Sequence, residues 1–247
     1  MQIGAQLYTV REFCKDLDGV SETLKKIADI GYKSIQYSGC CDCDPEWLKS
    51  ELDKNGLKCV LTHTSPDRLK NEIEKVVKVH DIIGCDYVGL GWFGFDKTHK
   101  SDDFYNEYKP IAKKLCKSGK YFMYHNHDGE FQKENGKLIL QTLADRFSPT
   151  EMGFTLDTYW IQAGGGDPSF WIESFKDRVP CIHLKDYAYG GKMAVIGECN
   201  LNFDRIFHSA EKSGTKYMLV EQDDCYGEDP FKCLKRSYNN LHTLGFE

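Results

Sequence analysis

Basic residues are too few in this sequence to favour a nucleic-acid partner. The chain has 32 Lys and Arg residues against 38 Asp and Glu residues, which gives a formal net charge of −6 at pH 7. A phosphate backbone is normally bound by a basic face, so we expect no nucleic acid as partner. The same deficit does not exclude a sugar or a sugar phosphate, because such a ligand needs only a local site.

Long apolar runs are also missing. No stretch of 18 apolar residues occurs, so we expect no membrane partner. The start "MQIGAQLYTV" lacks the basic residues and the apolar run of a signal peptide. We therefore expect a cytoplasmic location, where the 11 cysteines would remain free thiols. The dense cluster of Cys40, Cys41 and Cys43 lacks a second cysteine pair that would complete a thiolate metal site.

Five segments repeat one pattern, in which a helical stretch ends at a glycine and a β-rich run follows. Glycine accepts the left-handed conformation that ends a helix and turns the chain into a strand. Repeated helix-to-strand turns of this kind indicate βα units and a parallel sheet. The segments are "IADIGYKSIQY", "LDKNGLKCVLTH", "HDIIGCDYVGLG", "LCKSGKYFMYH" and "EKSGTKYMLVE", with Gly31, Gly56, Gly84, Gly119 and Gly214.

Three further apolar runs complete a set of eight strands: "QIGAQLY", "MGFTLD" and "VPCIHL". Helical patterns such as 67–83 follow the strands, and Asp167 with Pro168 marks a helix start. Eight units over 247 residues leave about 31 residues each, which suits a single-domain (β/α)8 TIM barrel spanning 1–247. An open doubly wound sheet is the main alternative, but the glycine-rich first turn typical of that fold is missing.

Groups that can bind a metal follow four successive predicted strands. They are His125 or His127, then Asp157, His183 and Glu221. Active sites of such barrels lie at the C-terminal ends of the strands, so these side chains are expected to converge. Their nitrogen and oxygen atoms suit one divalent Mn, Co, Zn or Fe ion. The alternatives are that Asp157 caps a turn, His183 is a core histidine and Glu221 is a loop carboxylate.

Other polar and aromatic residues near the same strand ends are candidates for binding the substrate or moving a proton. Aromatic faces suit the C–H surfaces of sugars, although several of the aromatic residues there are expected to serve core or loop packing. The substrate-binding candidates are Tyr8, His63, Trp92, Trp160 and Asp186. The catalytic candidates are Glu221, His127, Glu130 and Lys185, of which Lys185 is as readily interpreted as a surface lysine.

Five segments, in order, carry a resemblance to a known family: "YHNHDGEF", "FTLDTYWIQAGGGDP", "VPCIHLKDY", "VIGECNLNF" and "MLVEQD". Together they resemble the sugar phosphate isomerase/epimerase family, with its xylose isomerase-like barrel (AP endonuclease family 2). The resemblance covers nearly the whole chain. It implies one divalent metal held by Glu, Asp, His and Glu, of which the last three fall on Asp157, His183 and Glu221.

Two features depart from that pattern. The first glutamate of the family falls on His125, six residues after Gly119. The histidine often found shortly after the Asp is also absent, and Tyr159 and Trp160 occupy that segment. In the epimerases, two glutamates on opposite faces of the substrate form the acid/base pair. Only Glu221 remains here, unless Glu130 or His127 replaces the missing one.

The implied chemistry is abstraction of a proton next to a carbonyl of a carbohydrate, through an enediolate. Return of the proton gives isomerisation or epimerisation, whereas loss of a β-substituent gives a lyase or hydratase, for example on a 3-keto sugar or 3-keto glycoside. The lost glutamate weakens the symmetrical two-base scheme. A non-catalytic sugar-binding barrel and an abasic-DNA endonuclease are further alternatives, and a homo-oligomer is left open.

Overall fold

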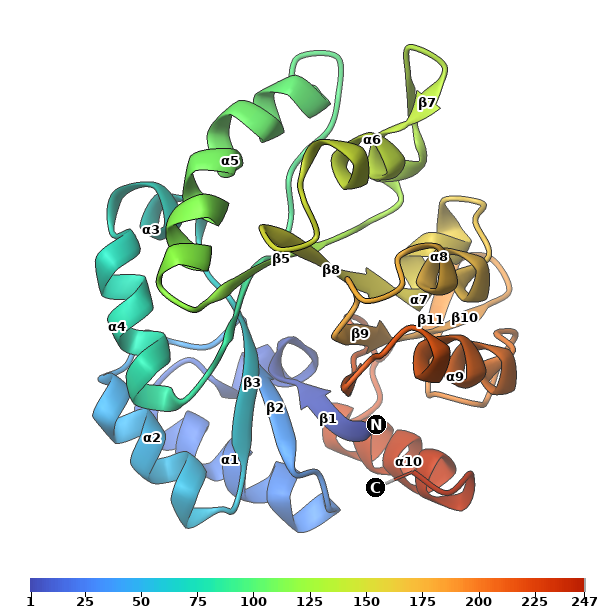
Figure 1. Cartoon of the computed structure of the whole chain (residues 1–247). Coiled ribbons are helices and arrows are strands. Elements are labelled where there is room, and N and C mark those ends of the chain that lie inside the picture. Colours follow the sequence, from blue (N-terminus) through green and yellow to red (C-terminus); the bar gives the residue numbers. More distant parts are fainter. Residues whose placement is uncertain (247) are drawn as a thin grey trace.

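A closed barrel of eight parallel strands forms the centre of the molecule in the computed structural model, which describes residues 1–246 (Figure 1). Around the barrel the order is β1–β12–β9–β8–β5–β4–β3–β2, and β1 closes it by pairing with β2. This confirms the predicted TIM barrel. The strands are β1 (Gln2–Gln6), β2 (Ser34–Tyr37), β3 (Lys58–His63), β4 (Tyr87–Leu90), β5 (Tyr121–His125), β8 (Met152–Asp157), β9 (Cys181–Leu184) and β12 (Tyr217–Val220).

Helices surround the barrel and cover its outer face (Figure 1). The five predicted helix-ending glycines all have positive φ, between 64° and 126°, as the sequence pattern requires. The predicted start at Asp167 is also present, because its side chain accepts hydrogen bonds from the backbone of Ser169 and Phe170. The helices are α1 (Leu17–Ile30), α2 (Pro45–Lys54), α3 (Pro66–Asn71), α4 (Ile73–Ile83), α5 (Ser101–Lys117), α6 (Ile139–Arg146), α7 (Thr158–Ala163), α8 (Pro168–Ser174), α9 (Phe203–Lys212) and α10 (Pro230–Thr243).

Several local features differ from a plain βα repeat. The helical pattern predicted over 67–83 is divided into α3 and α4, because Glu72 leaves helical geometry at φ −133° and ψ 33°. A 3-10 helix, η1 (Leu7–Phe13), follows β1, and η2 (Gly129–Phe131) follows β5. Two hairpins extend the loops after strands β5 and β9: β6 (Lys133–Glu134) with β7 (Lys137–Leu138), and β10 (Asp186–Ala188) with β11 (Lys192–Ala194).

Apolar side chains fill the barrel interior toward the N-terminal ends of its strands. The cluster of Val60, Leu61, Met123, Cys181 and Leu219 lies there, with the first residues of β4, β5 and β12 packed against it. The opposite end of the barrel is therefore the place where polar side chains can gather. The larger core lies between the strands and the helices and includes residues of both layers.

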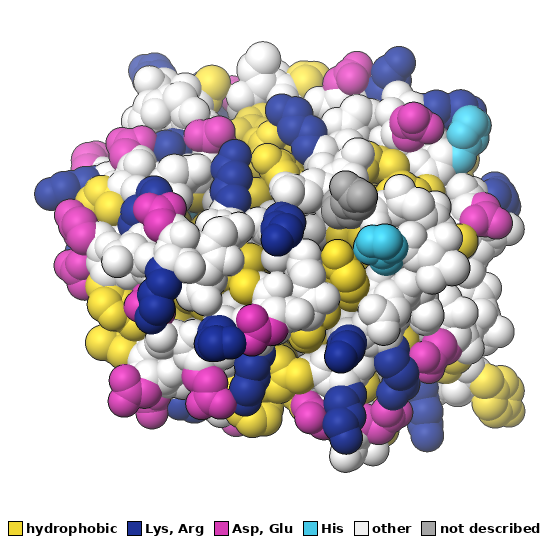
Figure 2. Space-filling model, turned by 90° about the horizontal axis from the view of Figure 1, so that it is seen from below, with side chains coloured by type: hydrophobic (Ala, Val, Ile, Leu, Met, Phe, Trp, Pro, Cys, Tyr) yellow, Lys and Arg dark blue, Asp and Glu magenta, His cyan; other side chains and the backbone are white. Residues whose placement is uncertain are grey.

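Acidic and basic side chains alternate on the face shown in Figure 2, without a continuous basic field. Elsewhere in the described chain, charged side chains form exposed ion pairs along single helices, such as Lys25 with Asp29 and Lys26 with Glu22. In residues 1–246, no helix is both long and apolar enough to cross a membrane.

Candidate metal centre

Four side chains from four neighbouring strands meet at the C-terminal end of the barrel. His125 ends β5, Asp157 ends β8, His183 lies in β9 and Glu221 follows β12. These strands are adjacent around the barrel, and Asp157 pairs in register with His183. Each residue offers one ligand atom, and the four atoms lie within 4.8 Å of one another. All four side chains are buried.

Hydrogen bonds fix the orientation of both histidine rings. His125 Nδ1 lies 2.9 Å from the carbonyl oxygen of Gly91, which can only accept, so Nδ1 carries the hydrogen. The unprotonated Nε2 then faces Asp157 Oδ2 at 3.1 Å. Burial lowers the pKa of His125, so its ring is neutral. Two acceptor atoms therefore face each other, an arrangement that is favourable only with a cation between them.

The ring of His183 is also held between an outer hydrogen bond and a carboxylate. Its Nε2 donates to the amide oxygen of Gln36 at 2.6 Å, and its Nδ1 lies 2.8 Å from Glu221 Oε2. Neither Nδ1 nor Oε2 has a hydrogen bond of good geometry, although both atoms are buried. A ring held by an outer hydrogen bond, with its other nitrogen aimed at carboxylates, is the usual form of a metal-binding histidine.

These observations fit one divalent metal ion. Burial opposes the charge on His183, but the nearby carboxylates of Glu221 and Asp157 raise the pKa of its ring to about 8. The site therefore attracts positive charge, which a proton or a metal ion can supply. Two imidazoles with two carboxylates match Mn²⁺, Co²⁺, Zn²⁺ or Fe²⁺ better than Ca²⁺, which prefers oxygen ligands alone.

Lys185 is not a surface lysine. Its side chain is 1% exposed, and its ammonium lies 3.1 Å from Asp157 Oδ2 and 3.0 Å from Glu221 Oε2. A third carboxylate, Asp223, lies 2.9 Å away. Burial opposes the charge, but these carboxylates raise the pKa of Lys185, so the amine stays protonated. The alternation of a strand explains why Lys185 shares a side with His183, two residues earlier.

A cavity of about 620 Å³ opens above the cluster. His125, Lys185 and Glu221 line it, whereas the deeper Asp157 and His183 do not. Of the predicted substrate-binding residues, four border this cavity: Tyr8, His63, Trp92 and Trp160.

His127 and His63 complete a group of close imidazoles. The ring of His127 lies between His125 and Trp160, with centroids at 4.7 and 4.9 Å, and its Nδ1 has no hydrogen-bond partner. Burial lowers the pKa of His127 to about 3, so this ring is neutral. His63 stacks on His125 at 5.4 Å and its Nδ1 meets the hydroxyl of Ser38 at 3.1 Å.

Two predicted site residues point elsewhere. The carboxylate of Glu130 accepts hydrogen bonds from the Tyr124 hydroxyl and from the His127 amide, and burial raises its pKa to about 7. Asp186 accepts four backbone N–H groups, from Tyr187 and from residues 197, 199 and 201. Neither side chain borders the cavity. Glu130 braces the loop after β5, and Asp186 braces the hairpin after β9.

Sequence reasoning missed Asp223 and the role of Gln36. Asp223 borders the cavity and pairs with Lys185, and a signal was available in the acidic run "VEQDD" after the last strand. Gln36 lies within β2, and no local pattern indicates that it reaches His183 across the barrel. The interpretation of Asp157 as a cap is also correct, because its Oδ1 accepts from Trp160 N at the start of α7.

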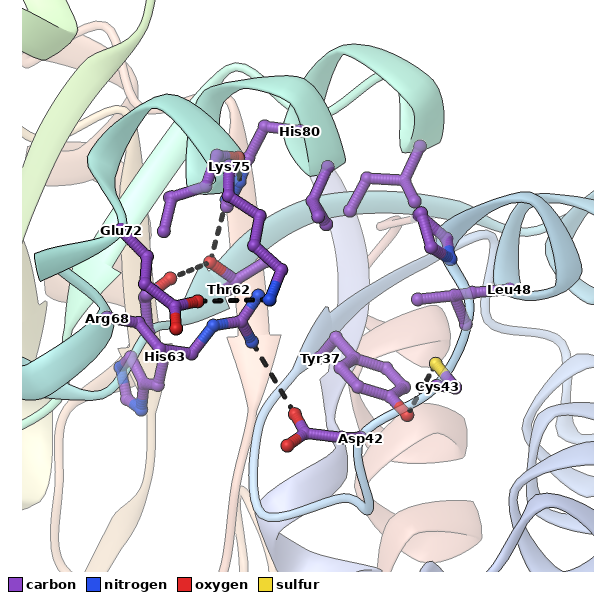
Figure 3. Close-up of a pocket in the computed structure, with 15 residues that line it drawn as sticks. Tyr37, Asp42, Cys43, Leu48, Thr62, His63, Arg68, Glu72, Lys75 and His80 are labelled. Carbon is purple, nitrogen blue, oxygen red and sulfur yellow. Dashed lines mark hydrogen bonds and ion pairs between the residues drawn. The ribbon is translucent and has the colours of Figure 1, made fainter.

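A second cavity of about 440 Å³ lies between α2, α4 and the strands behind them (Figure 3). His63 and Thr64 border both cavities, but the remaining walls are different. His80 reaches this cavity from α4 and bonds to Thr62, while Arg68 and Lys75 pair with Asp42 and Glu72 at its edge. These charges are already paired, and the candidate ligands lie outside this cavity. The thiols of Cys40, Cys41 and Cys43 are free and, within residues 1–246, join no cluster of metal-ligand type.

The closed barrel and the converging ligands at its C-terminal end define a (β/α)8 protein with a candidate metal centre. The chain belongs to the family described as xylose isomerase-like TIM barrel, whose sequence pattern matches residues 24–236. The resemblance seen in the sequence is thereby confirmed. No curated protein matches the chain.

Solved structures with the same fold cover almost the whole chain. A sugar phosphate isomerase/epimerase from Parabacteroides distasonis superimposes with a TM-score of 0.85 at 22% identity, covering 99% of this chain and 94% of that one. An L-ribulose 3-epimerase gives 0.76 at 14% identity, with 99% and 94% covered. A probable 3-DHS dehydratase from Bacillus anthracis gives 0.76 at 12% identity, with 98% and 99% covered. At such identities the likeness shows the fold.

Proposed function

We propose that this protein is a divalent-metal-dependent enzyme that removes a proton next to a carbonyl of a carbohydrate, in the manner of a sugar isomerase or epimerase. One observation carries the proposal: four ligand atoms within 4.8 Å lie directly below a cavity of about 620 Å³ with aromatic walls. The family and the sugar-modifying neighbours with this fold support the same class.

His125, Asp157, His183 and Glu221 are the proposed ligands. A divalent ion held there supplies Lewis-acid chemistry, which polarises a carbonyl and stabilises developing negative charge on oxygen. The protein itself supplies the orientation, because the Gly91 carbonyl and the Gln36 amide hold the two imidazoles in place.

Proton transfer is assigned to side chains that border the cavity. Burial disfavours the charge on Glu221, but Lys185 and His183 lower the pKa of its carboxyl below the usual range, so Glu221 is ionised. His127 is neutral and its Nδ1 is free. Both groups are unprotonated and border the cavity, and we propose Glu221 as the base with His127 as the second proton carrier. Lys185 stays charged and stabilises negative charge on the substrate.

Elimination is a second candidate reaction. The specific observation is that His125 stands where the related epimerases place the first of two glutamates, and its Nε2 faces Asp157 as a ligand. The cavity therefore lacks one carboxylate of a symmetrical two-base scheme. A lyase or hydratase needs a base on one face only, and the fold of a probable 3-DHS dehydratase supports this alternative.

The decisive experiment combines metal analysis with proton NMR in D₂O. The purified protein should contain about one divalent ion per chain. A panel of ketoses, their phosphates and 3-keto glycosides should then show exchange of one α-proton for deuterium. Isomerisation or epimerisation is read from a new sugar, and elimination from loss of the β-substituent. The His127→Gln variant should keep the metal and lose most of the exchange.

Two results would contradict the proposal. Three tightly bound zinc ions per chain would instead indicate the cluster expected for an abasic-DNA endonuclease. One bound metal without deuterium uptake from any member of the panel would favour a barrel that binds a sugar without turning it over.

A further inference from the structure

The ammonium of Lys185 shares two carboxylate oxygens with the candidate metal centre. Asp157 Oδ2 lies 3.1 Å from both Lys185 Nζ and His125 Nε2. Glu221 Oε2 lies 3.0 Å from Lys185 Nζ and 2.8 Å from His183 Nδ1. A cation held by the two histidines would therefore lie beside a lysine that binds the same two oxygens.

Lys185 has little freedom to move away. Its backbone amide donates to Thr158 Oγ1 at 2.9 Å, and the same hydroxyl donates to the Lys185 carbonyl at 2.7 Å. The side chain passes the ring of Trp160, with Nζ 5.7 Å from the ring centroid. Like charges at such short range repel, and burial leaves little water to screen them. The ammonium must then be held by something other than the metal ligands.

Asp223 offers that partner. Its Oδ2 lies 2.9 Å from Lys185 Nζ, and it comes from the loop after β12, on the cavity side. Asp223 lies outside the four-residue cluster and pairs with the lysine without pairing with either histidine. When all three carboxylates are ionised, their charge of −3, the +1 of Lys185 and the +2 of a divalent ion sum to zero.

We propose that Asp223 and Lys185 together set the metal affinity of the site. Lys185 competes with the metal for the oxygens of Asp157 and Glu221, and Asp223 restrains this competition by binding the ammonium itself. Asp223 is thus a positioning residue that acts on the metal through Lys185. The inference rests on the metal centre of the proposed function and adds the pair that regulates it.

A double-mutant cycle tests this arrangement. Mn²⁺ and Co²⁺ dissociation constants are measured by titration calorimetry, and by competition with a metallochromic chelator, on the wild type, D223N, K185M and the double variant. Asp223→Asn should weaken metal binding by about 10- to 100-fold, the range typical of residues behind the ligands. Lys185→Met should strengthen it by about tenfold or more. In the K185M background, the further change Asp223→Asn should alter the constant by less than about threefold.

Two controls make the cycle specific. Asp224→Asn removes an exposed carboxylate one residue further along and should leave the affinity within about twofold of wild type. Asp223→Glu keeps the charge and should recover much of the affinity lost in D223N. Circular dichroism and thermal unfolding without metal establish that each variant is folded, and Lys185→Gln replaces K185M if the methionine variant does not fold.

The outcomes distinguish a failure of the proposed metal centre from a failure of the Asp223–Lys185 pair. No metal bound by the wild type would contradict the proposed metal centre itself. Metal binding that is unchanged in D223N, or weakened equally with and without Lys185, would overturn the proposed role of the pair while the centre stands. Equal weakening with and without Lys185 would mean that Asp223 acts only as one more negative charge near the ion.

Discussion

His183 and His80 are both buried histidines, but they belong to different regions and meet different partners. In the second cavity, His80 has both ring nitrogens satisfied, by Thr62 Oγ1 at 2.9 Å and by the Val76 carbonyl at 2.8 Å (Figure 3). At the barrel end, His183 Nδ1 faces carboxylates and has no proper hydrogen bond. A satisfied ring stabilises the fold, whereas an unsatisfied ring among carboxylates calls for a cation.

Two buried aspartates show the same contrast. The carboxylate of Asp186 is surrounded by four backbone N–H donors and needs no other partner. Asp157 uses one oxygen to cap α7 and turns the other toward His125, His183 and Lys185. Burial alone therefore does not identify a functional residue. What distinguishes the two regions is whether the local chain already satisfies the polar atoms.

The largest expected effect comes from removing one ligand. Asp157→Asn should lower metal affinity by more than about 100-fold, because the amide offers no negative charge to the ion. Asparagine caps a helix as well as aspartate does, so the folded structure should persist. Metal content after dialysis measures the loss, and His80→Gln is the matched control that should retain the ion. Equal metal content in D157N and the wild type would show that Asp157 is not a ligand and that it does not differ from Asp186 in this respect.

Asp186→Ala should affect stability rather than metal binding. The substitution leaves four backbone N–H groups without their charged acceptor, and we expect a loss of about 3–4 kcal/mol in the free energy of unfolding. Urea unfolding measures this change. A normal metal constant in the same variant would support the structural role, whereas a raised KM at unchanged stability would return Asp186 to the substrate-binding residues.

Acid should weaken the region around His80. Burial lowers the pKa of His80 from 6.5 to about 4, so the unfolded chain binds a proton more readily than the folded one. The stability contributed by the neutral ring is present above pH 6.5 and is lost as the pH falls toward 4. Between pH 7 and pH 5 the loss is about 2 kcal/mol.

The variant His80→Gln isolates this contribution. Its free energy of unfolding should fall less steeply between pH 7 and pH 5 than that of the wild type, when both are measured by urea unfolding. Parallel pH profiles for the two proteins would show that His80 does not carry the acid sensitivity.

The smallest effect is expected at the cavity wall. Trp92 is 63% exposed and borders the cavity, whereas Trp171 is buried in the core. Trp92→Ala should change the free energy of unfolding by less than about 0.5 kcal/mol, and it should raise KM several-fold by removing an aromatic face. Trp92→Phe keeps such a face and should behave nearly like wild type. A large stability loss in W92A would place this ring with the core.

The strands of the barrel were predictable because each depends on local signals, such as Gly119 before "KYFMYH" and Gly214 before "TKYMLVE". The convergence of the four ligand candidates follows from the same strand order. The loops were harder, because their hydrogen bonds are not local in sequence. Asp186 is turned inward by amides up to 15 residues away, and the division at Glu72 interrupts an unbroken apolar pattern. Gln36 reaches His183 over 147 positions of chain, which no sequence pattern indicates.

Asp157 is the last residue of β8 and, at the same time, the N-cap of α7, with no loop between the two elements. A ligand in this place cannot swing aside unless the strand end or the helix start is disrupted. The fold thus sets the positions of the ligands before the ion binds. Chelators should therefore strip the metal and leave a folded, reloadable protein with a lower melting temperature, in contrast to domains that unfold when their zinc is removed.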